Sequence, residues 1–198
     1  MRSETLFALA DSFRSFVELT TLDLGNTTTR IDGTSAEGVK ALVAHLKDLS
    51  NLTILNLRLN ALRSEGAREI AENLQYLSKL TTLDLRGNIR DDSARILAAH
   101  LQYLPKLTTL ALGHNDSGAN GATAIAAHLK DLPNLTTLNL GGNSIHVNGA
   151  SSLAAHLQEL SNLTTLDLSD NDIRDKGARA LALHLKYLRN LTTLQEST

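Results

Sequence analysis

The sequence predicts an α/β solenoid, in which short parallel strands alternate with α-helices along one elongated domain of residues 1–198. The segment Leu-x-x-Leu-x-Leu-x-x-Asn recurs at steps of 33, 28, 27, 28, 28 and 28 residues. Each copy holds an alternating leucine–polar–leucine run, which is typical of a half-buried strand, and about ten residues later the apolar period becomes helical. Such a regular step is typical of stacked units, none of which can bury its apolar face alone.

Repeats 1 to 6 begin near residues 19, 52, 80, 107, 135 and 163, and a partial repeat covers 191–198. Residues 1–18 are expected to form an N-terminal capping half-repeat, because Leu9, Phe13 and Phe16 occupy slots that leucines hold in later units. Ser and Asp are good N-cap residues and mark the expected helix starts. These predicted N-caps are Ser35, Ser64, Asp91 and Asp175.

A helix separates successive strands, so the strands must run parallel. Strands pair at ~4.8 Å, whereas helices pack no closer than ~8–10 Å. This mismatch predicts a horseshoe segment with a parallel sheet on the concave face and helices on the convex face. The asparagine after each strand is expected to bond the backbone of neighbouring turns, and the threonines of Leu-Thr-Thr-Leu to form a ladder on the sheet.

The composition argues against several classes of partner and location. Net charge is −2, and 19 basic and 21 acidic residues are spread along the chain, which does not fit a nucleic-acid or membrane-surface binder. There is no cysteine, so a reducing interior is expected. Glu4 and Asp11 interrupt the start of the chain too early for a secretory signal. We therefore expect a soluble, cytoplasmic protein.

The repeated segment, as in Leu80-Thr-Thr-Leu-Asp-Leu-Arg-Gly-Asn88, resembles the leucine-rich repeat proteins of the ribonuclease-inhibitor-like class. The helical motif Gly-Ala-x-x-Leu-Ala-x-His-Leu is also similar to repeats of NOD-like receptors and of Ran GTPase-activating proteins. The near-identity of the units, with Asn-Leu-Thr-Thr-Leu at 134, 162 and 190, resembles leucine-rich repeat effectors of intracellular bacterial pathogens. That resemblance implies a protein delivered into the cytosol of a host cell.

The candidate binding surface is the concave face, where slots that the repeat leaves free to vary do vary. Three rows of slots follow one another along each strand: Asp23, Asn56, Asp84, Ala111, Asn139 and Asp167; then Gly25, Arg58, Arg86, Gly113, Gly141 and Ser169; then Asn26, Leu59, Gly87, His114, Gly142 and Asp170. Arginine and exposed apolar residues are typical of binding hot spots. The predicted partner-binding residues are Asn56, Arg58, Leu59, Asp84, Arg86, His114, Asn139, Asp167 and Asp170. For any one of them the alternative is a solvated strand face.

Histidine recurs at one helical slot, at positions 45, 100, 128, 156 and 184. Equivalent residues of stacked helices lie ~8–10 Å apart, whereas ligands lie ~2 Å from a shared zinc ion. A packing or surface role is therefore the prediction, although a ligand near His114, Asp116 and His146 stays open. We expect no catalytic residue, no metal and no cofactor.

The sequence thus predicts a non-enzymatic module that binds, and sequesters or inhibits, a host or bacterial protein, without binding nucleic acid or membrane. The exposed strip of the concave sheet has an area of roughly 500 Å², whereas a standard interface buries ~800 Å² on each partner. Rim loops are therefore expected to take part in binding. They include Thr27–Ser35, Arg63, Arg90, His146, Asp172 and Arg174. The alternatives are a GTPase regulator resembling Ran GTPase-activating proteins and a structural array without a natural partner.

The C-terminal edge is the last feature that the sequence singles out. Leu183, Leu191 and Leu194 are expected to lie where no following repeat covers them. Exposed strand edges favour pairing with another chain. The pattern predicts weak self-association, or a chain that has been cut from a longer protein.

Overall fold

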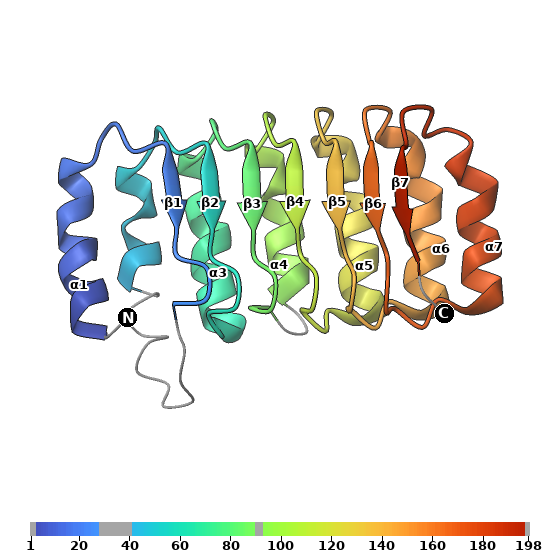
Figure 1. Cartoon of the computed structure of the whole chain (residues 1–198), viewed down its shortest axis with the longest axis horizontal. Helices are drawn as coiled ribbons and strands as arrows, with labels where there is room; N and C mark the ends of the chain where they lie inside the picture. The colour runs from blue at the N-terminus through green and yellow to red at the C-terminus, as the bar shows by residue number, and fades with distance from the viewer. Residues whose placement is uncertain (1–2, 28–40, 90–92, 197–198) are drawn as a thin grey trace.

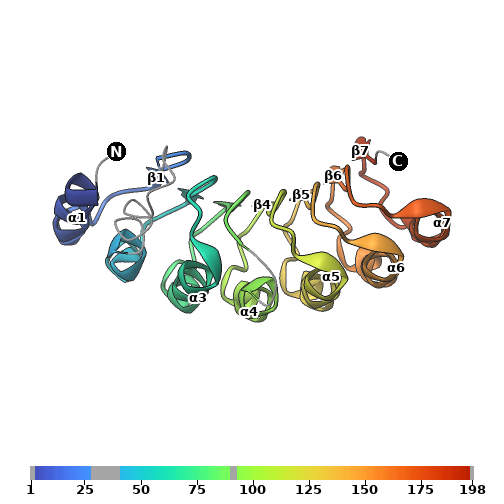
Figure 2. The same cartoon turned by 90° about the horizontal axis from the view of Figure 1, so that it is seen from below.

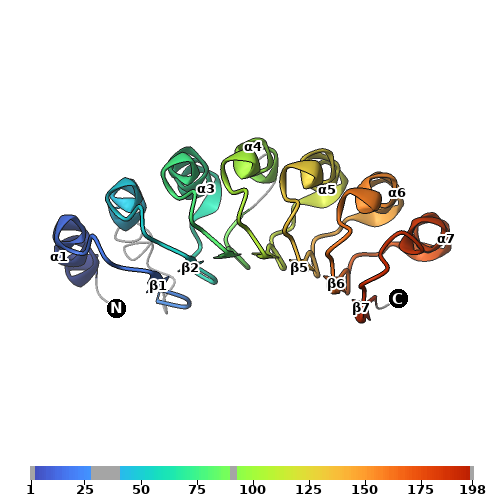
Figure 3. The same ribbon diagram turned by 90° about the horizontal axis from the view of Figure 1, so that it is seen from above.

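The computed structural model describes residues 3–27, 41–89 and 93–196. Within them, seven parallel strands form one sheet in chain order (Figure 1). The strands are β1 (Thr21–Asp23), β2 (Ile54–Asn56), β3 (Thr82–Asp84), β4 (Thr109–Ala111), β5 (Thr137–Asn139), β6 (Thr165–Asp167) and β7 (Thr193–Gln195). Seen from below and from above, the chain forms an arc with the strands on its inner side and the helices on its outer side (Figures 2 and 3). The predicted α/β solenoid is confirmed.

Helices connect the strands, and most of them end in a short 3-10 turn. The α-helices are α1 (Ser3–Ser12), α3 (Arg63–Asn73), α4 (Ser93–His100), α5 (Gly118–Ala127), α6 (His146–His156) and α7 (Arg174–Leu185). The 3-10 turns are η1 (Phe13–Ser15), η2 (Leu46–Asp48), η3 (Leu74–Tyr76), η4 (Leu101–Tyr103), η5 (Leu129–Asp131) and η6 (Leu157–Glu159). None of the helices among the described residues is both long enough and apolar enough to span a membrane.

The core is a stack of leucines, one set per repeat. The central strand leucines Leu55, Leu83, Leu110 and Leu138 are fully buried. At the N-terminal end, Phe13 is buried but Phe16 is 39% exposed, unlike the buried Leu104 whose slot it was expected to share. Its ring lies 6.4 Å from that of Phe13.

The threonines form the expected ladder. In register, Thr21, Thr82 and the later equivalents pair across the sheet, with Ile54 as the exception in β2. The preceding threonine of each repeat donates its hydroxyl to the carbonyl oxygen of its equivalent one repeat earlier, at 3.0–3.1 Å. Each strand is therefore tied to its neighbour by side chains as well as by the backbone ladder.

The asparagines after the strands form a second, buried ladder. Asn60, Asn88, Asn115, Asn143 and Asn171 are at most 3% exposed. In the middle of the ladder, the Oδ1 of Asn88 accepts the backbone N–H of Asn60 at 2.8 Å, and its Nδ2 donates to the carbonyl oxygen of Leu57 at 2.6 Å. Thr27, which replaces asparagine in repeat 1, donates its hydroxyl to Asn60 at 2.9 Å. The predicted structural role of these residues is confirmed.

The prediction of the helix starts was wrong. Ser64 and Asp175 are the second residues of α3 and α7, and the N-cap positions hold Leu62 and Ile173, whose side chains are buried in the core. The next repeat supplies a partner instead, since Arg63 donates its backbone N–H to the carbonyl oxygen of Asn88 at 3.0 Å. Side-chain capping is therefore not needed there. Ser35 and Asp91 lie outside the described residues.

The 27-residue repeat changes one helix contact. Four helices carry a glycine at the slot that faces the preceding helix: Gly66, Gly121, Gly149 and Gly177. A Cβ at Gly149 would lie 2.5 Å from Ile145 Cγ2 and 3.0 Å from Ala122 Cβ, so no side chain fits. In α4 the same slot holds Ser93, which is 1% exposed and whose hydroxyl has no hydrogen-bond partner in the described structure.

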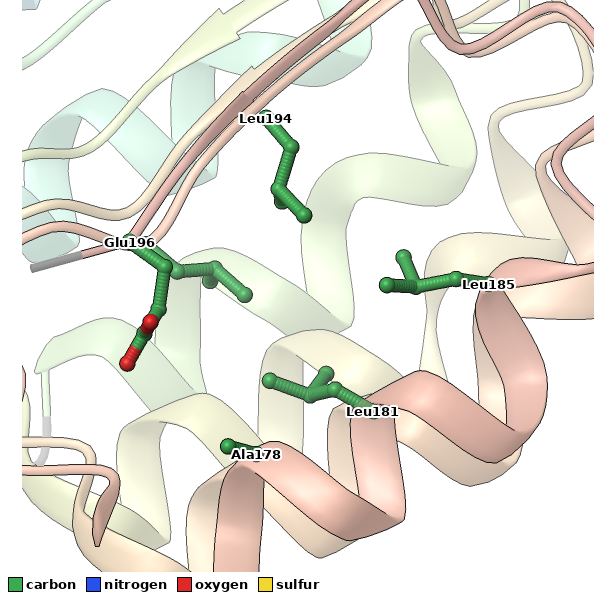
Figure 4. A pocket seen from close by; sticks show the side chains of 6 residues that line it. Ala178, Leu181, Leu185, Leu194 and Glu196 are labelled. Carbon is green, nitrogen blue, oxygen red and sulfur yellow. The ribbon is translucent and has the colours of Figure 1, made fainter. Parts of the chain in front are cut away.

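The C-terminal end of the stack has an apolar hollow of ~80 Å³ between β7 and α7 (Figure 4). Ala178, Leu181, Leu185 and Leu194 point toward one another there, with Glu196 at the side. Leu194 is 45% exposed, as expected. Leu183 is also exposed, as expected, but its equivalents in inner repeats, such as Ala155, are exposed as well. Its exposure therefore belongs to this helical slot and not to the C-terminal edge.

Candidate protein-binding surface

The nine predicted residues all lie on the concave face or at its edge, but they differ in exposure. Arg58, Leu59, His114 and Asp170 are exposed. Asn56, Arg86, Asn139 and Asp167 are half-buried. Asp84 is only 8% exposed, which leaves little of its carboxylate for a partner. The fold brings these side chains onto one surface, but not as nine equivalent contact points.

Arg86 is held by an ion pair within its own repeat. Its Nη2 lies 2.6 Å from Asp84 Oδ2, and its Nε donates to Asp84 Oδ1 at 3.0 Å. These hydrogen bonds raise the pKa of Arg86 above its ordinary value; partial burial opposes this, and the charges of Asp84 and Asp167 add to it. The pair is bidentate and partly buried, which is the stronger kind of ion pair. The charge of Arg86 is therefore already paired with the carboxylate of Asp84.

Arg58 occupies the same slot one repeat earlier and has no such partner. Two residues before it stands Asn56, whose Oδ1 accepts only the backbone N–H of Arg58 at 3.1 Å. Arg58 forms no ion pair with any of the described residues. Its side chain lies across Gly25, where an added Cβ would be 2.9 Å from Arg58 Cγ. This arginine is exposed and forms no ion pair, although the exposed Asp23 lies in register with Asn56 on the neighbouring strand β1.

The C-terminal half of the face is acidic and internally bonded. Asp167 Oδ2 accepts the Nδ2–H of Asn139 at 2.7 Å, and Asp167 Oδ1 accepts the hydroxyl of Ser169 at 2.6 Å. Ala111 and Gly113 lie between this cluster and Arg86 and are both buried. The concave face thus carries Asp23 on β1, Arg58 just after β2, the Asp84–Arg86 pair at the end of β3 and an acidic cluster near β6.

The third row has an unusual backbone. Leu59, His114 and Asp170 have φ values of 56°, 54° and 54°, in the left-handed region that favours glycine. Gly87 and Gly142 fill the same slot in the alternate repeats, with φ of 66°. Side chains from the row lie over these glycines, because a Cβ at Gly87 would be 2.6 Å from Leu59 Cδ2. Leucine at such a position costs about 1–2 kcal/mol of backbone strain.

The sequence reasoning missed Ile54. It lies on the concave face in β2 at a slot that threonine holds in all other strands, and it is 38% exposed. The signal was present in the sequence, because Leu-Thr-Ile-Leu is the only break in the Leu-Thr-Thr-Leu series. With Arg58 and Leu59, it gives repeat 2 three exposed residues that differ from the repeat pattern.

The histidines of the helical row bond within their own repeats. Nδ1 of His128 lies 2.9 Å from Asp131 Oδ2, and Nδ1 of His100 lies 2.9 Å from the carbonyl oxygen of Ile96. Within residues 3–27, 41–89 and 93–196, no group of three or more His, Asp or Glu residues could hold a metal ion. A local structural role explains these histidines.

The rim adds polar contacts between repeats 5 and 6. His146 Nδ1 lies 3.1 Å from Asp172 Oδ2, and Arg174 Nη2 donates to the same oxygen at 2.8 Å. The hydrogen bond from Arg174 is the main cause that lowers the pKa of Asp172; desolvation opposes it, and the hydrogen bond from His146 and the charges of both residues add to the lowering. Of the other predicted rim residues, 28–35 and Arg90 lie outside the described residues.

A family model described as "Leucine Rich repeat" matches residues 48–71, 103–126, 131–154 and 156–182, together half of the chain. Among solved structures, actin-binding site 2 of leiomodin-1 aligns with a TM-score of 0.56 and 21% identity, over 67% of this chain and 78% of that chain. The tropomodulin C-terminal domain of Caenorhabditis elegans aligns with a TM-score of 0.58 and 10% identity, over 96% of this chain and 93% of that chain. No curated protein sequence matches the chain. At these identities the structures show a shared fold.

Proposed function

The chain belongs to the leucine-rich repeat family, and from that premise we propose that it is a non-enzymatic module that binds another protein with its concave face and rim. The observation that carries the proposal is the set of exposed side chains on that face which the repeat does not require. They stand on a sheet whose threonine and asparagine ladders fix the backbone. A surface that is already ordered loses little conformational entropy when it binds.

The mode of action that we propose is occlusion of a folded partner. No hydrogen bond joins a serine hydroxyl to a histidine in the part of the chain that the structure describes, and the histidine row is occupied by local bonds. The face carries an unpaired arginine, Arg58, near β2 and an acidic cluster near β6, and such separated charges favour orientation of a partner. Binding is therefore expected to be stoichiometric, cofactor-free and weakened by salt.

The finer identity is also part of the proposal. α-Helices of 8 to 12 residues follow the strands of repeats 2 to 6, as the ribonuclease-inhibitor-like class would have. The uniform, cysteine-free units support an effector of an intracellular bacterium that acts in the host cytosol, with a host or bacterial protein as the target. The leiomodin-1 structure is an actin-binding site, which makes actin a first protein to assay. The comparisons lend no support to the alternative of a GTPase regulator.

The proposed function is tested by reconstitution. The chain is used to capture proteins from host and bacterial lysates, and each captured protein, together with purified actin, is mixed with the chain and sized by light scattering. We expect a complex of fixed stoichiometry that dissociates as salt is raised. Turnover of a substrate without such a complex would contradict the proposal.

The C-terminal edge supports weak self-association of the 198-residue chain. Thr193 and Gln195 bond β6, so the N–H and C=O of Leu194 point away from the sheet by the alternation of a parallel ladder. Two copies could pair their β7 edges and cover the hollow of Figure 4. Sedimentation equilibrium at high concentration should show a dimer that Leu194→Lys abolishes; a strict monomer would rule the pairing out.

A further inference from the structure

Ile54, Arg58 and Leu59 are exposed side chains of repeat 2 on the concave face, and we call these three residues the repeat-2 patch. We propose that it anchors an extended segment of a partner protein, and that this segment presents a carboxylate beside an aliphatic side chain. The proposal rests on the proposed function, because it names the partner chemistry of one part of the same face. Three independent features of repeat 2 point to it.

The first feature is the charge. Of the two arginines in the concave rows, Arg86 is paired with Asp84, whereas Arg58 has no acidic partner among the described residues. An arginine fork binds a carboxylate with two parallel hydrogen bonds. The acidic groups near β6 are already bonded to neighbours and would repel a carboxylate. Although Asp23 lies on the neighbouring strand, the guanidinium of Arg58 is the group in these rows that is left to pair with a partner's acidic residue.

The second feature is apolar surface on both sides of that charge. Ile54 is 38% exposed and Leu59 is 50% exposed. Ile54 begins β2, and Arg58 follows it by four residues, in the turn just after the strand ends at Asn56. This spacing suits a few residues of extended chain. Other repeats hold threonine at the slot of Ile54, and asparagine, glycine, histidine or aspartate at that of Leu59.

The third feature is the backbone conformation at position 59, which costs more free energy with leucine than with glycine. Leu59 adopts φ of 56° at a slot where repeats 3 and 5 use glycine. Gly25 and Gly87, on either side, leave room for Arg58 and Leu59 to lie flat across the neighbouring repeats. Because Gly25 and Gly87 have no side chain, nothing projects from the second row at position 25 or from the third row at position 87. The backbone strain at Leu59 and the room that the neighbouring glycines leave together indicate that Leu59 is kept for contact with a partner.

The proposed segment belongs to a protein, because a nucleic acid needs several clustered cations. Only one unpaired arginine stands in the rows, on a chain of net charge −2. One arginine and two aliphatic side chains instead match a peptide that carries an acidic residue next to an aliphatic one.

A random peptide library displayed on phage tests the proposal. It is selected against the full chain and, in parallel, against a triple variant, Ile54→Thr, Arg58→Ser and Leu59→Gly. Each substitution copies the residue that another repeat holds at that slot, namely Thr82, Ser169 and Gly87. Arg68→Glu, an exposed charge change on α3 of the same repeat, serves as the control.

We expect the enriched peptides to share an Asp or Glu next to Leu, Ile, Val or Phe. Their affinity should fall about 30-fold in the triple variant, which is the size of a hot-spot loss, and stay unchanged in Arg68→Glu. The triple variant should keep the circular dichroism of the wild type, and its urea midpoint should not fall, because glycine relieves the backbone strain at position 59. Peptides without an acidic residue, or no enrichment over the triple variant, would overturn the proposal.

The outcome is distinguishable from failure of the proposed function. Peptides that bind the triple variant as well as the wild type but lose binding in Asp167→Asn would reject the repeat-2 patch and leave concave-face binding intact. The absence of any stoichiometric complex with a whole protein would reject the proposed function itself.

Discussion

Arg58 in repeat 2 and Arg86 in repeat 3 hold equivalent positions, two residues after Asn56 and Asp84. Asp84 accepts hydrogen bonds from both the side chain and the backbone N–H of Arg86, whereas Asn56 accepts one only from the backbone N–H of Arg58. One arginine is thereby neutralised within its strand, and the other faces solvent with its charge. The comparison teaches that a residue type at a surface slot does not define a binding residue; the neighbour two positions earlier decides whether it is available.

The largest effect should come from the frame that both repeats share. Leu55 and Leu83 are fully buried at the same register position. Replacing either with alanine should cost about 2–5 kcal/mol, whereas Arg58→Ser should stay within about 0.5 kcal/mol. Urea unfolding of the three variants measures this. Unequal losses for the two leucines would show that repeats 2 and 3 are not equivalent scaffolds.

The asparagine ladder should come next. Asn88→Ala removes the acceptor of the backbone N–H of Asn60 and the donor to Leu57. Leaving a buried N–H without a partner costs about 1–3 kcal/mol. Hydrogen exchange of the Asn60 amide should accelerate in this variant, and an unchanged rate would mean that the ladder does not join repeat 2 to repeat 3.

Ser93 distinguishes repeat 3 from the repeats around it. Its buried hydroxyl has no partner in the described structure, so Ser93→Ala should raise the stability by about 1 kcal/mol. The unfolding midpoint in urea is the measurement. A lower midpoint in the variant would mean that the hydroxyl makes a contact which the shorter repeat needs.

The smallest effect concerns the exposed counterpart of the Asp84–Arg86 pair. Arg174 follows Asp172 by two residues and lowers the pKa of that carboxyl. A carboxyl whose folded-state pKa is depressed contributes stability above its unfolded-state pKa and loses it as pH falls through the folded value. Arg174→Ala should therefore raise the pKa of Asp172. A carbon-13 NMR titration of the Asp172 carboxyl measures this change. An unchanged titration would contradict the pairing.

Much of this molecule follows from its sequence. The leucine period predicts the strands, helices and curvature, because every repeat must bury the same face against the next. The availability of individual surface residues could not be predicted, since it depends on side-chain bonds such as that of Asp84 with Arg86. The N-cap of α3 at Leu62 was missed because the next repeat supplies the partner of the helix start; no such bond explains Ile173, the N-cap of α7. Ile54 was missed although its slot breaks the threonine series.

The central claim, that the residue two positions earlier sets the availability of each arginine, can be measured without a partner. Phenylglyoxal modifies unpaired guanidinium groups, and peptide mapping by mass spectrometry gives a rate for each arginine. We predict that Arg58 reacts faster than Arg86, that Asn56→Asp slows Arg58, and that Asp84→Asn accelerates Arg86. Equal rates for the two arginines in the wild type, or rates that neither substitution changes, would contradict the account.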